Sequence, residues 1–343
     1  MSTKTTLSLL LVMILSLCYS QGNKQAIRSS ISEGQSIENN TLSEPISEVV
    51  RMVFQDSKGN IWFGTQSGAF RLRGNSLMRI KGIQSEGGKR VTIKDITEGH
   101  DGKIWFGHTD GISSLEGETV MNYYESDGLI SHDVWNMEAD AQGNIWIGTI
   151  EGACTFDGQT FTHFELPEGI IDSTLGVSST QMVHSILEDS QGAIWFCTNA
   201  GLFKYADHIL YPMSEKLGIQ TPFVNEVIED IRGNFWISTK EALYKLAGDT
   251  LTNITQAIPE MGKGIGSIAE DQDGTIWFVF NQHHLYTYDG VQLKEFQKSA
   301  TNEGPVIYQI FKDQSQRLWF VGYGGAYRLE DGRFRHISTH GPW

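Results

Sequence analysis

The stretch ADAQGNIWIGT at residues 139–149 recurs, with substitutions, seven times along this chain. Its other copies are QDSKGNIWFGT (55–65), EGHDGKIWFGH (98–108), EDSQGAIWFCT (188–198), EDIRGNFWIST (229–239), EDQDGTIWFVF (270–280) and KDQSQRLWFVG (312–322). Each copy contains one tryptophan, and successive tryptophans are 43, 41, 49, 41, 41 and 42 positions apart. A period in the low forties, made of strand-forming residues, is typical of one propeller blade per repeat.

Each repeat also divides into four strand-length runs. In the third repeat these are DVWNMEA, NIWIGT, ACTFD and TFTHFE, all rich in β-branched or aromatic residues. The first and second runs are separated by D-x-x-G, where Asp caps turn amides and Gly supplies a positive φ. The third and fourth runs are joined by Asp-Gly or a close variant, which is a strong hairpin signal. We therefore predict an all-β fold, a seven-bladed β-propeller of four-stranded antiparallel blades.

The recurring tryptophans and aspartates have a structural interpretation. A sheet packed between two neighbouring blades needs a large apolar wedge, and the apolar neighbours of each tryptophan favour burial over sugar stacking. Asp271, Asp273 and Gly274 resemble part of a calcium loop, but the further carboxylates and the distant Glu of an EF-hand are missing. We expect turn caps at these positions, with no metal and no cofactor.

The repeats occupy residues 46–338, so we expect one propeller with a segment at 21–45 before it and a tail at 339–343. No room then remains for a second catalytic or signalling domain. Residues 25–32 are a candidate extra outer strand that would close the ring. The alternative is closure by packing between the first and last blades.

The first 20 residues are predicted to be a signal peptide. Lys4 precedes an apolar run from Leu7 to Leu17, which is followed by small or polar residues. This run is too short to span a bilayer, so no membrane span is expected. The predicted location is secreted or periplasmic, and the alternative is a lipoprotein anchored through Cys18, because Leu15-Ser16-Leu17-Cys18 resembles a lipobox.

Charge and cysteine content exclude two classes of protein. The formal net charge is −15, and loss of residues 1–20 would remove one lysine and no acid, so nucleic acid is not an expected partner. A local basic pocket can still hold an anionic ligand. After such cleavage only Cys154 and Cys197 would remain, too few for a disulfide framework. Cys197 stands where other repeats have Gly, so we expect a small buried residue rather than a disulfide.

The fuller unit DGLISHDVWNMEADAQGNIWIGTIEGACTFDG at residues 127–158 resembles the two-component regulator propeller repeat. That repeat has a G-L-x-x-x-x-V lead-in followed by D-x-x-G-x-[IL]-W-[IF]-G-T-x-x-G-[IL]. The resemblance implies a propeller that senses or binds a ligand, often a carbohydrate, outside the cytoplasm. In the family such repeats usually belong to hybrid sensor kinases with two propellers, a β-sandwich, a membrane helix and a kinase. Because this sequence shows none of those additional parts, the resemblance implies a separate membrane sensor as a possible partner.

Alignment of the seven innermost strands exposes one irregular column. An apolar column of Val and Ile is followed by unlike side chains, namely Arg51, Lys94, Trp135, His184, Asn225, Gly266 and Tyr308. A position that core packing would make uniform, but that varies in chemistry, is a candidate recognition surface. The alternative is that these residues fill the spaces between blades and satisfy one another.

We therefore predict ligand-binding residues at Arg51, Lys94, Trp135, His184, Asn225 and Tyr308. The aromatic residues could stack on a sugar while the basic ones bind a carboxylate or a sulfate. Longer lead-ins at residues 82–92 and 165–181 are expected to face the same way.

The favoured interpretation is a binding or sensor propeller without chemistry of its own, for which we assign no catalytic residue. Its ligand would be an oligosaccharide, or a protein or peptide. A lyase is the second hypothesis, because His108, His283 and His284 fall between second and third strands, where a base could face the pocket. The third hypothesis is a protein-interaction scaffold.

Overall fold

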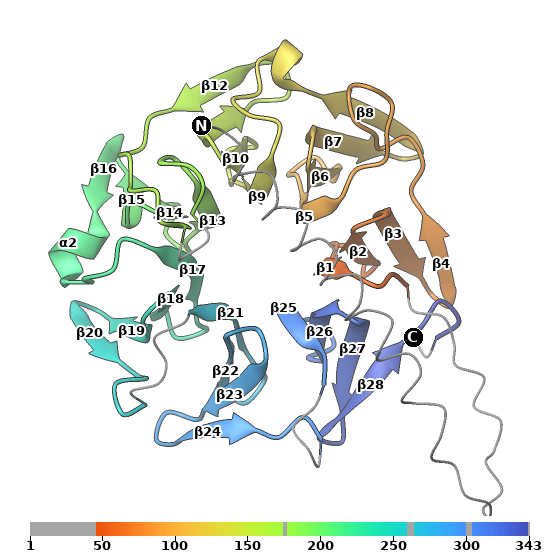
Figure 1. Ribbon diagram of the computed structural model, residues 1–343. Helices are drawn as coiled ribbons and strands as arrows, with labels where there is room; N and C mark the ends of the chain where they lie inside the picture. Colours follow the sequence, from red (N-terminus) through yellow and green to blue (C-terminus); the bar gives the residue numbers. More distant parts are fainter. Residues whose placement is uncertain (1–45, 174–176, 259–263, 300–303, 342–343) are drawn as a thin grey trace, which may run out of the picture. The chain divides into compact units, whose positions relative to one another are not determined.

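The computed structural model describes residues 46–173, 177–258, 264–299 and 304–341. These residues form seven four-stranded antiparallel sheets, which follow one another around a ring (Figure 1). The predicted fold class is confirmed. The expected signal peptide, the Cys18 anchor and the candidate closing strand at 25–32 all lie outside the described residues.

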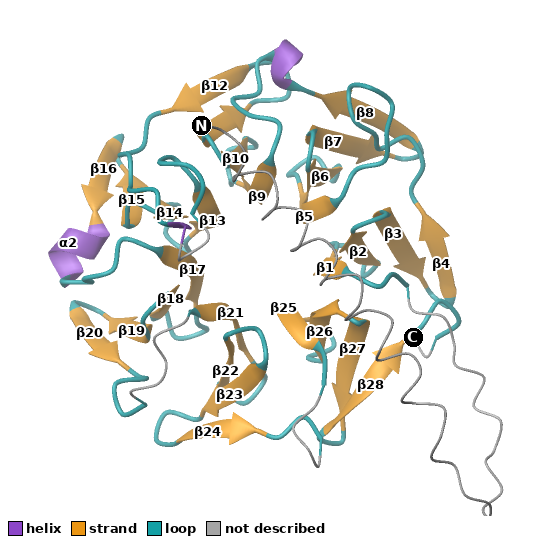
Figure 2. Cartoon of the chain, in the orientation of Figure 1, coloured by secondary structure: helices purple, strands orange, loops and turns teal. Residues whose placement is uncertain are grey.

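Every sheet contains four consecutive strands, and two short helical segments are named among the described residues (Figure 2). The strands, blade by blade, are β1 (Val50–Gln55), β2 (Ile61–Thr65), β3 (Gly68–Arg73), β4 (Ser76–Arg79); β5 (Ile93–Glu98), β6 (Ile104–His108), β7 (Gly111–Glu116), β8 (Thr119–Tyr123); β9 (Val134–Ala139), β10 (Ile145–Thr149), β11 (Gly152–Phe156), β12 (Phe161–Phe164); β13 (Val183–Glu188), β14 (Ile194–Thr198), β15 (Leu202–Ala206), β16 (Ile209–Pro212); β17 (Val224–Glu229), β18 (Phe235–Thr239), β19 (Leu243–Ala247), β20 (Thr250–Asn253); β21 (Ile265–Glu270), β22 (Ile276–Phe280), β23 (His284–Tyr288), β24 (Leu293–Phe296); β25 (Val306–Lys312), β26 (Leu318–Tyr323), β27 (Gly325–Glu330) and β28 (Arg333–Ile337). The helical segments are η1 (Glu125–Asp127) and α2 (Met213–Leu217). Neither has the length and apolar character that crossing a bilayer requires.

The D-x-x-G turns are built as predicted, and they also hold the tryptophans. In blade 4, Oδ1 of Asp189 accepts hydrogen bonds from the amides of Gln191 (3.0 Å) and Ala193 (2.9 Å). Its Oδ2 accepts one from Nε1 of Trp195 at 2.8 Å. The same indole bond occurs in six blades, with Asp56, Asp140, Asp189, Asp230, Asp271 and Asp313 as acceptors. Each aspartate therefore joins the turn to the core.

The core lies between the blades rather than in a single centre. Its clusters each combine side chains of two neighbouring blades, and each contains the tryptophan of the preceding one. The seven repeat tryptophans are 0–7% exposed. Several meet a phenylalanine of the next blade edge-on, such as Trp62 with Phe106 at 5.8 Å and Trp146 with Phe196 at 5.5 Å between ring centroids. The wedge interpretation of the tryptophans is confirmed.

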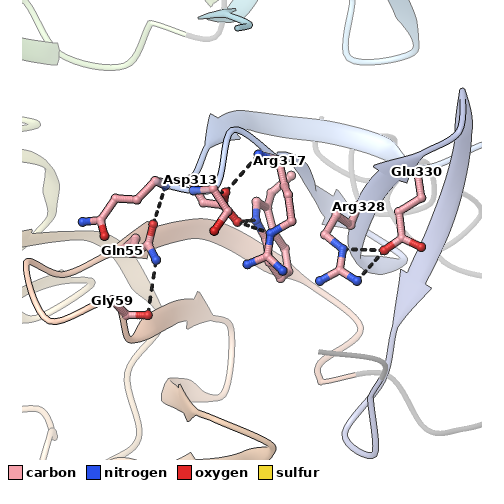
Figure 3. Close-up of polar contacts among 9 residues, drawn as sticks. Gln55, Gly59, Asp313, Arg317, Arg328 and Glu330 are labelled. Carbon is pink, nitrogen blue, oxygen red and sulfur yellow. Dashed lines mark hydrogen bonds and ion pairs between the residues drawn. The ribbon is translucent and has the colours of Figure 1, made fainter.

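The ring closes by packing between blades 1 and 7, since β25–β28 all come from the last repeat. The amide of Val53 donates to Oε1 of Gln309 at 2.7 Å, and the amide of Gly324 donates to the carbonyl of Glu48 at 2.8 Å. Figure 3 shows Gln55 beside the Asp313 turn, where its Oε1 accepts the amide of Gln314 at 2.6 Å. Of the two alternatives for closure, the described residues show the packing of first against last blade.

The two cysteines of the described residues, Cys154 and Cys197, are buried and free. Cys154 lies in the cluster between blades 2 and 3, whereas Cys197 lies in the cluster between blades 4 and 5. The expectation of a small buried residue at Cys197 is confirmed, and the alternative of a disulfide between them is wrong.

Candidate functional site

The irregular column of the sequence corresponds to a bulge on the innermost strand of each blade. In blade 1, Val50 pairs with Thr65 and Met52 with Gly64, so Arg51 is the extra residue in the register. The registers of five other innermost strands skip the equivalent residue in the same way, and that of blade 6 skips both Gly266 and Ser267. A bulge redirects the side chain of the extra residue. The bulge therefore explains why this column can leave the blade core.

These redirected side chains meet at one end of the central channel. All six predicted residues line a cavity of about 190 Å³. A second cavity of about 420 Å³ shares Arg51, Lys94, Trp135, Asn225 and Tyr308 with the first, and reaches Gln282. Gly266, which has no side chain, also lines the second cavity. We call the two cavities and their lining the channel mouth.

One cluster of contacts at the channel mouth joins Lys94, Asp133 and Trp135. The Lys94 ammonium lies 2.6 Å from Oδ1 of Asp133 and 3.8 Å from the ring centroid of Trp135. Nε1 of Trp135 donates to Oδ2 of Asp133 at 3.1 Å. Burial lowers the pKa of Lys94, while the hydrogen bond and the charge of Asp133 act in the opposite direction. The amine, the carboxylate and the indole ring thus form one cluster of mutual contacts.

A second cation–aromatic pair, one amide and one imidazole also line the channel mouth. The Arg51 guanidinium carbon lies 5.6 Å from the ring centroid of Tyr308. Nδ2 of Asn225 donates to the carbonyl of Ile265 at 3.1 Å. The ring of His184 packs 4.2 Å from that of Phe223, and its Nε2 is buried without a hydrogen-bond partner among the described residues. Burial lowers the pKa of His184 to about 3, so its ring is neutral at pH 7.

The sequence analysis missed the neighbouring column, which ties the blades together around the channel. Its residues are Met52, Asp95, Asn136, Ser185, Glu226, Ser267 and Gln309. Five of them accept the backbone amide of an innermost strand in the next blade, as Asp95 does from Met137 (2.5 Å) and Glu226 from Ile268 (2.8 Å). In six repeats the residue directly after the irregular column has a side chain that can accept a hydrogen bond, and this regularity could have revealed the second column from the sequence.

Two carboxyl groups of this second column are unusually basic. Burial raises the pKa of Asp95 to about 7 and that of Glu226 to about 7, although amide hydrogen bonds oppose the shift. Glu138, which accepts the amide of Glu188 at 3.1 Å, has its pKa raised to about 8 by burial. The carboxyl groups of Asp95 and Glu226, which line the channel mouth, therefore change their charge near neutral pH.

Asp95→Asn is expected to make the protein less sensitive to alkaline pH. An unfolded Asp ionises near pH 4, whereas the folded carboxyl ionises near pH 7, so folding stability is fully present below pH 4 and lost as pH rises through 7. The amide oxygen of Asn can still accept the Met137 amide but carries no charge. Melting temperatures at pH 5 and pH 8 should therefore differ less in Asp95→Asn than in the native chain. The exposed control Glu118→Gln should leave the difference unchanged, and an equal effect of both variants would contradict the assignment.

The histidines of the lyase hypothesis do not line the channel mouth. His108 is fully buried, its Nε2 lies 3.0 Å from Oγ of Ser113, and burial lowers its pKa to about 4. It stands where other repeats have a threonine that caps the same turn. Nδ1 of His284 lies 2.7 Å from Oε1 of Glu295 on the neighbouring strand β24. The expectation that the rings of His108 and His284 face the pocket is therefore wrong, and His283 is not among the residues that line either cavity.

The longer lead-ins also stay outside the lining as far as the structure describes them. The first lies against blade 2, where Tyr124 donates its hydroxyl to the carbonyl of Gln84 at 3.0 Å. In the second, the amide of Gly169 donates to the carbonyl of Thr180 at 2.6 Å. Within the described ranges no three His, Cys, Asp or Glu side chains are grouped as a metal site would require. The polar and aromatic side chains of the channel mouth are thus those of the bulged residues and of the column after them.

The chain is thus a seven-bladed propeller that carries unlike polar side chains at one end of its channel. The family profile for the two component regulator propeller matches residues 44–67, 128–151 and 176–200. Three of the seven repeats thus match this family profile, which confirms the resemblance seen in the sequence. No curated protein matches the chain.

Solved structures share the fold at low sequence identity. The "extracellular domain" of BT3049 from B. thetaiotaomicron, which its description assigns to a hybrid two component system, is 20% identical with a TM-score of 0.65. That of BT4673 from the same organism is 21% identical with a TM-score of 0.64. The match covers 85% of this chain in both cases but only 41% and 39% of those chains. Virginiamycin B lyase from Staphylococcus aureus is 12% identical with a TM-score of 0.61, over 83% of this chain and 96% of the lyase.

Proposed function

We propose that this protein is a ligand-binding sensor propeller that recognises an acidic oligosaccharide at the channel mouth. The observation that carries the proposal is the convergence of bulged residues from six blades on one pair of cavities. Two of these residues are basic and two are aromatic, in a chain whose net charge is −15. An anionic sugar would find there two basic side chains on a chain that is otherwise net negative.

The arrangement of the channel mouth suits a sugar that carries a carboxylate or a sulfate. Arg51 can form two parallel hydrogen bonds with such a group, and Lys94 supplies a second positive charge. Asn225 and Tyr308 add groups that can bond to hydroxyls. One face of Trp135 is already covered by Lys94, so sugar stacking there uses the remaining face or displaces the amine.

The proposal also includes a location and a partner. An extracellular or periplasmic site of action, with a separate membrane sensor that reads the occupied propeller, agrees with the structural relatives being extracellular domains of sensor systems. The identities of 20–21% limit this support to the fold. The proposed location therefore depends on the signal peptide predicted at residues 1–20.

Arg51→Ala is expected to weaken binding of an acidic oligosaccharide about tenfold or more, because it removes a charge-assisted hydrogen bond. Calorimetry against uronic-acid and sulfated oligosaccharides, with neutral sugars of the same linkage, measures the change. Trp135→Ala should weaken the same ligand. The matched control is Lys204→Ala. It also removes a cation that lies over a tryptophan ring, 4.9 Å from that of Trp195, but Lys204 does not line the channel mouth, so binding should be unchanged.

Two results would overturn this proposal. A confirmed glycan ligand whose affinity is unchanged in Arg51→Ala and Trp135→Ala would show that binding occurs elsewhere. Binding of peptides but of no glycan would favour the protein-interaction scaffold instead.

A further inference from the structure

Blade 2 departs from the other blades at two positions that touch the same tryptophan. Gly99 stands where the six other blades have the aspartate that accepts the indole N–H. No described residue accepts the N–H of Trp105. Ser114, which pairs with Trp105 across the strands, stands where four other blades have Lys or Arg.

In those four blades the basic side chain lies over the tryptophan ring. The cation-to-centroid distances are 5.4 Å for Arg71 and Trp62, 4.9 Å for Lys204 and Trp195, 5.2 Å for Lys245 and Trp236, and 5.4 Å for Arg328 and Trp319. Blades 3 and 6 have Thr155 and Thr287 at this position but retain the aspartate. Blade 2 alone lacks both the carboxylate and a long or branched partner over its ring.

The two truncations open a cavity of about 350 Å³ above Trp105. It lies on the face that carries the turns between first and second strands, opposite the channel mouth. Tyr123 and Phe156 line it beside Trp105, with ring centroids 5.9 and 5.7 Å from that of the indole. Such a group of aromatic faces attracts cations.

Asp101 replaces the missing aspartate as the cap of the blade 2 turn, but no described side chain replaces the missing cation. Oδ1 of Asp101 accepts the amide of Lys103 at 3.1 Å, the bond that Asp56 makes to the amide of Asn60 in blade 1. The Lys103 ammonium is drawn to Asp101 (2.8 Å) and toward Glu116 (3.7 Å), both at the rim. Among the described residues no cation lies within cation–π range of Trp105. The empty position is therefore that of a cation.

We propose that this cavity binds a small organic cation, an alkylammonium or alkylguanidinium compound, in the place that Lys or Arg holds in four other blades. The aromatic rings of Trp105, Tyr123 and Phe156 surround its charged head. At the rim the Asp101 and Glu116 carboxylates share the single ammonium of Lys103, which leaves one negative charge to balance that of the ligand. Binding here is independent of the channel mouth, since the two sites share no lining residue.

The test is calorimetric titration with n-butylguanidinium chloride, with n-butanol as the uncharged comparison. The native protein is expected to bind the cation saturably and n-butanol far more weakly. Ser114→Lys places the chain's own ammonium over Trp105, as Lys204 lies over Trp195, and should weaken binding at least about tenfold. The matched control Thr155→Lys makes the same change one blade further on and should bind like the native protein.

Glu116→Gln supplies a second test that does not alter the core. Its side chain is 75% exposed, so folding should be unaffected, and the loss of one rim charge should weaken the cation severalfold without changing n-butanol binding. The proposal fails if the native protein shows no saturable binding, if n-butanol binds equally well, or if Ser114→Lys binds as tightly as Thr155→Lys.

Discussion

Trp195→Ala is expected to lower the free energy of unfolding by about 3–5 kcal/mol, the usual cost of deleting a fully buried aromatic side chain. Trp195 is 1% exposed and lies in the cluster that joins blades 4 and 5. The substitution would also leave Oδ2 of Asp189 without its indole donor and Lys204 without the ring beneath it. The loss therefore combines a cavity with two disrupted polar contacts.

Urea denaturation followed by circular dichroism measures this effect. Trp135→Ala is the matched control, because it removes the same side chain from the half-buried channel mouth and should cost much less. Equal destabilisation by the two substitutions would contradict the assignment of Trp195 as an interblade wedge.

Gly111→Ala is expected to destabilise the protein by about 2–4 kcal/mol, because backbone strain and overlap with backbone atoms act together. Gly111 begins β7 with a φ of 126°, a conformation that side-chain-bearing residues rarely adopt. A Cβ at this position would overlap the backbone oxygen of Tyr123 on the paired strand β8. Relief would require separation of two strands of blade 2.

The matched control for this prediction lies in the same blade. Gly117 has a φ of 63°, and a Cβ there would meet nothing within 4 Å. Gly117→Ala should therefore cost only about 1 kcal/mol, from backbone strain alone. Thermal melting of both variants checks the difference, and an equal loss would show that overlap with Tyr123 adds nothing.

The candidate site was only partly predictable from the residues. Arg51 and Trp135 were identified because they interrupt an otherwise regular repeat, and the structure places them on one cavity. Arg51 contacts Tyr308, which is distant in sequence, and Trp135 contacts Lys94 of the preceding blade. Both contacts depend on tertiary structure and on side-chain rotamers, so no local sequence pattern indicates them. His284 was misplaced because spacing alone cannot say whether a loop residue points to the channel or, as here, to Glu295 on β24.

Short-range patterns of this sequence determine the four strands of each blade, the D-x-x-G turns and the number of repeats. These features depend on alternation and turn chemistry within a few residues, which the sequence displays directly. Properties that arise between neighbouring blades are decided only by the tertiary structure. Examples are the raised pKa of Asp95 and the hydrogen bond from Val53 to Gln309, which joins the first blade to the last. The cavity over Trp105 has the same origin, since Gly99 and Ser114 are ordinary residues until folding places both against one indole ring.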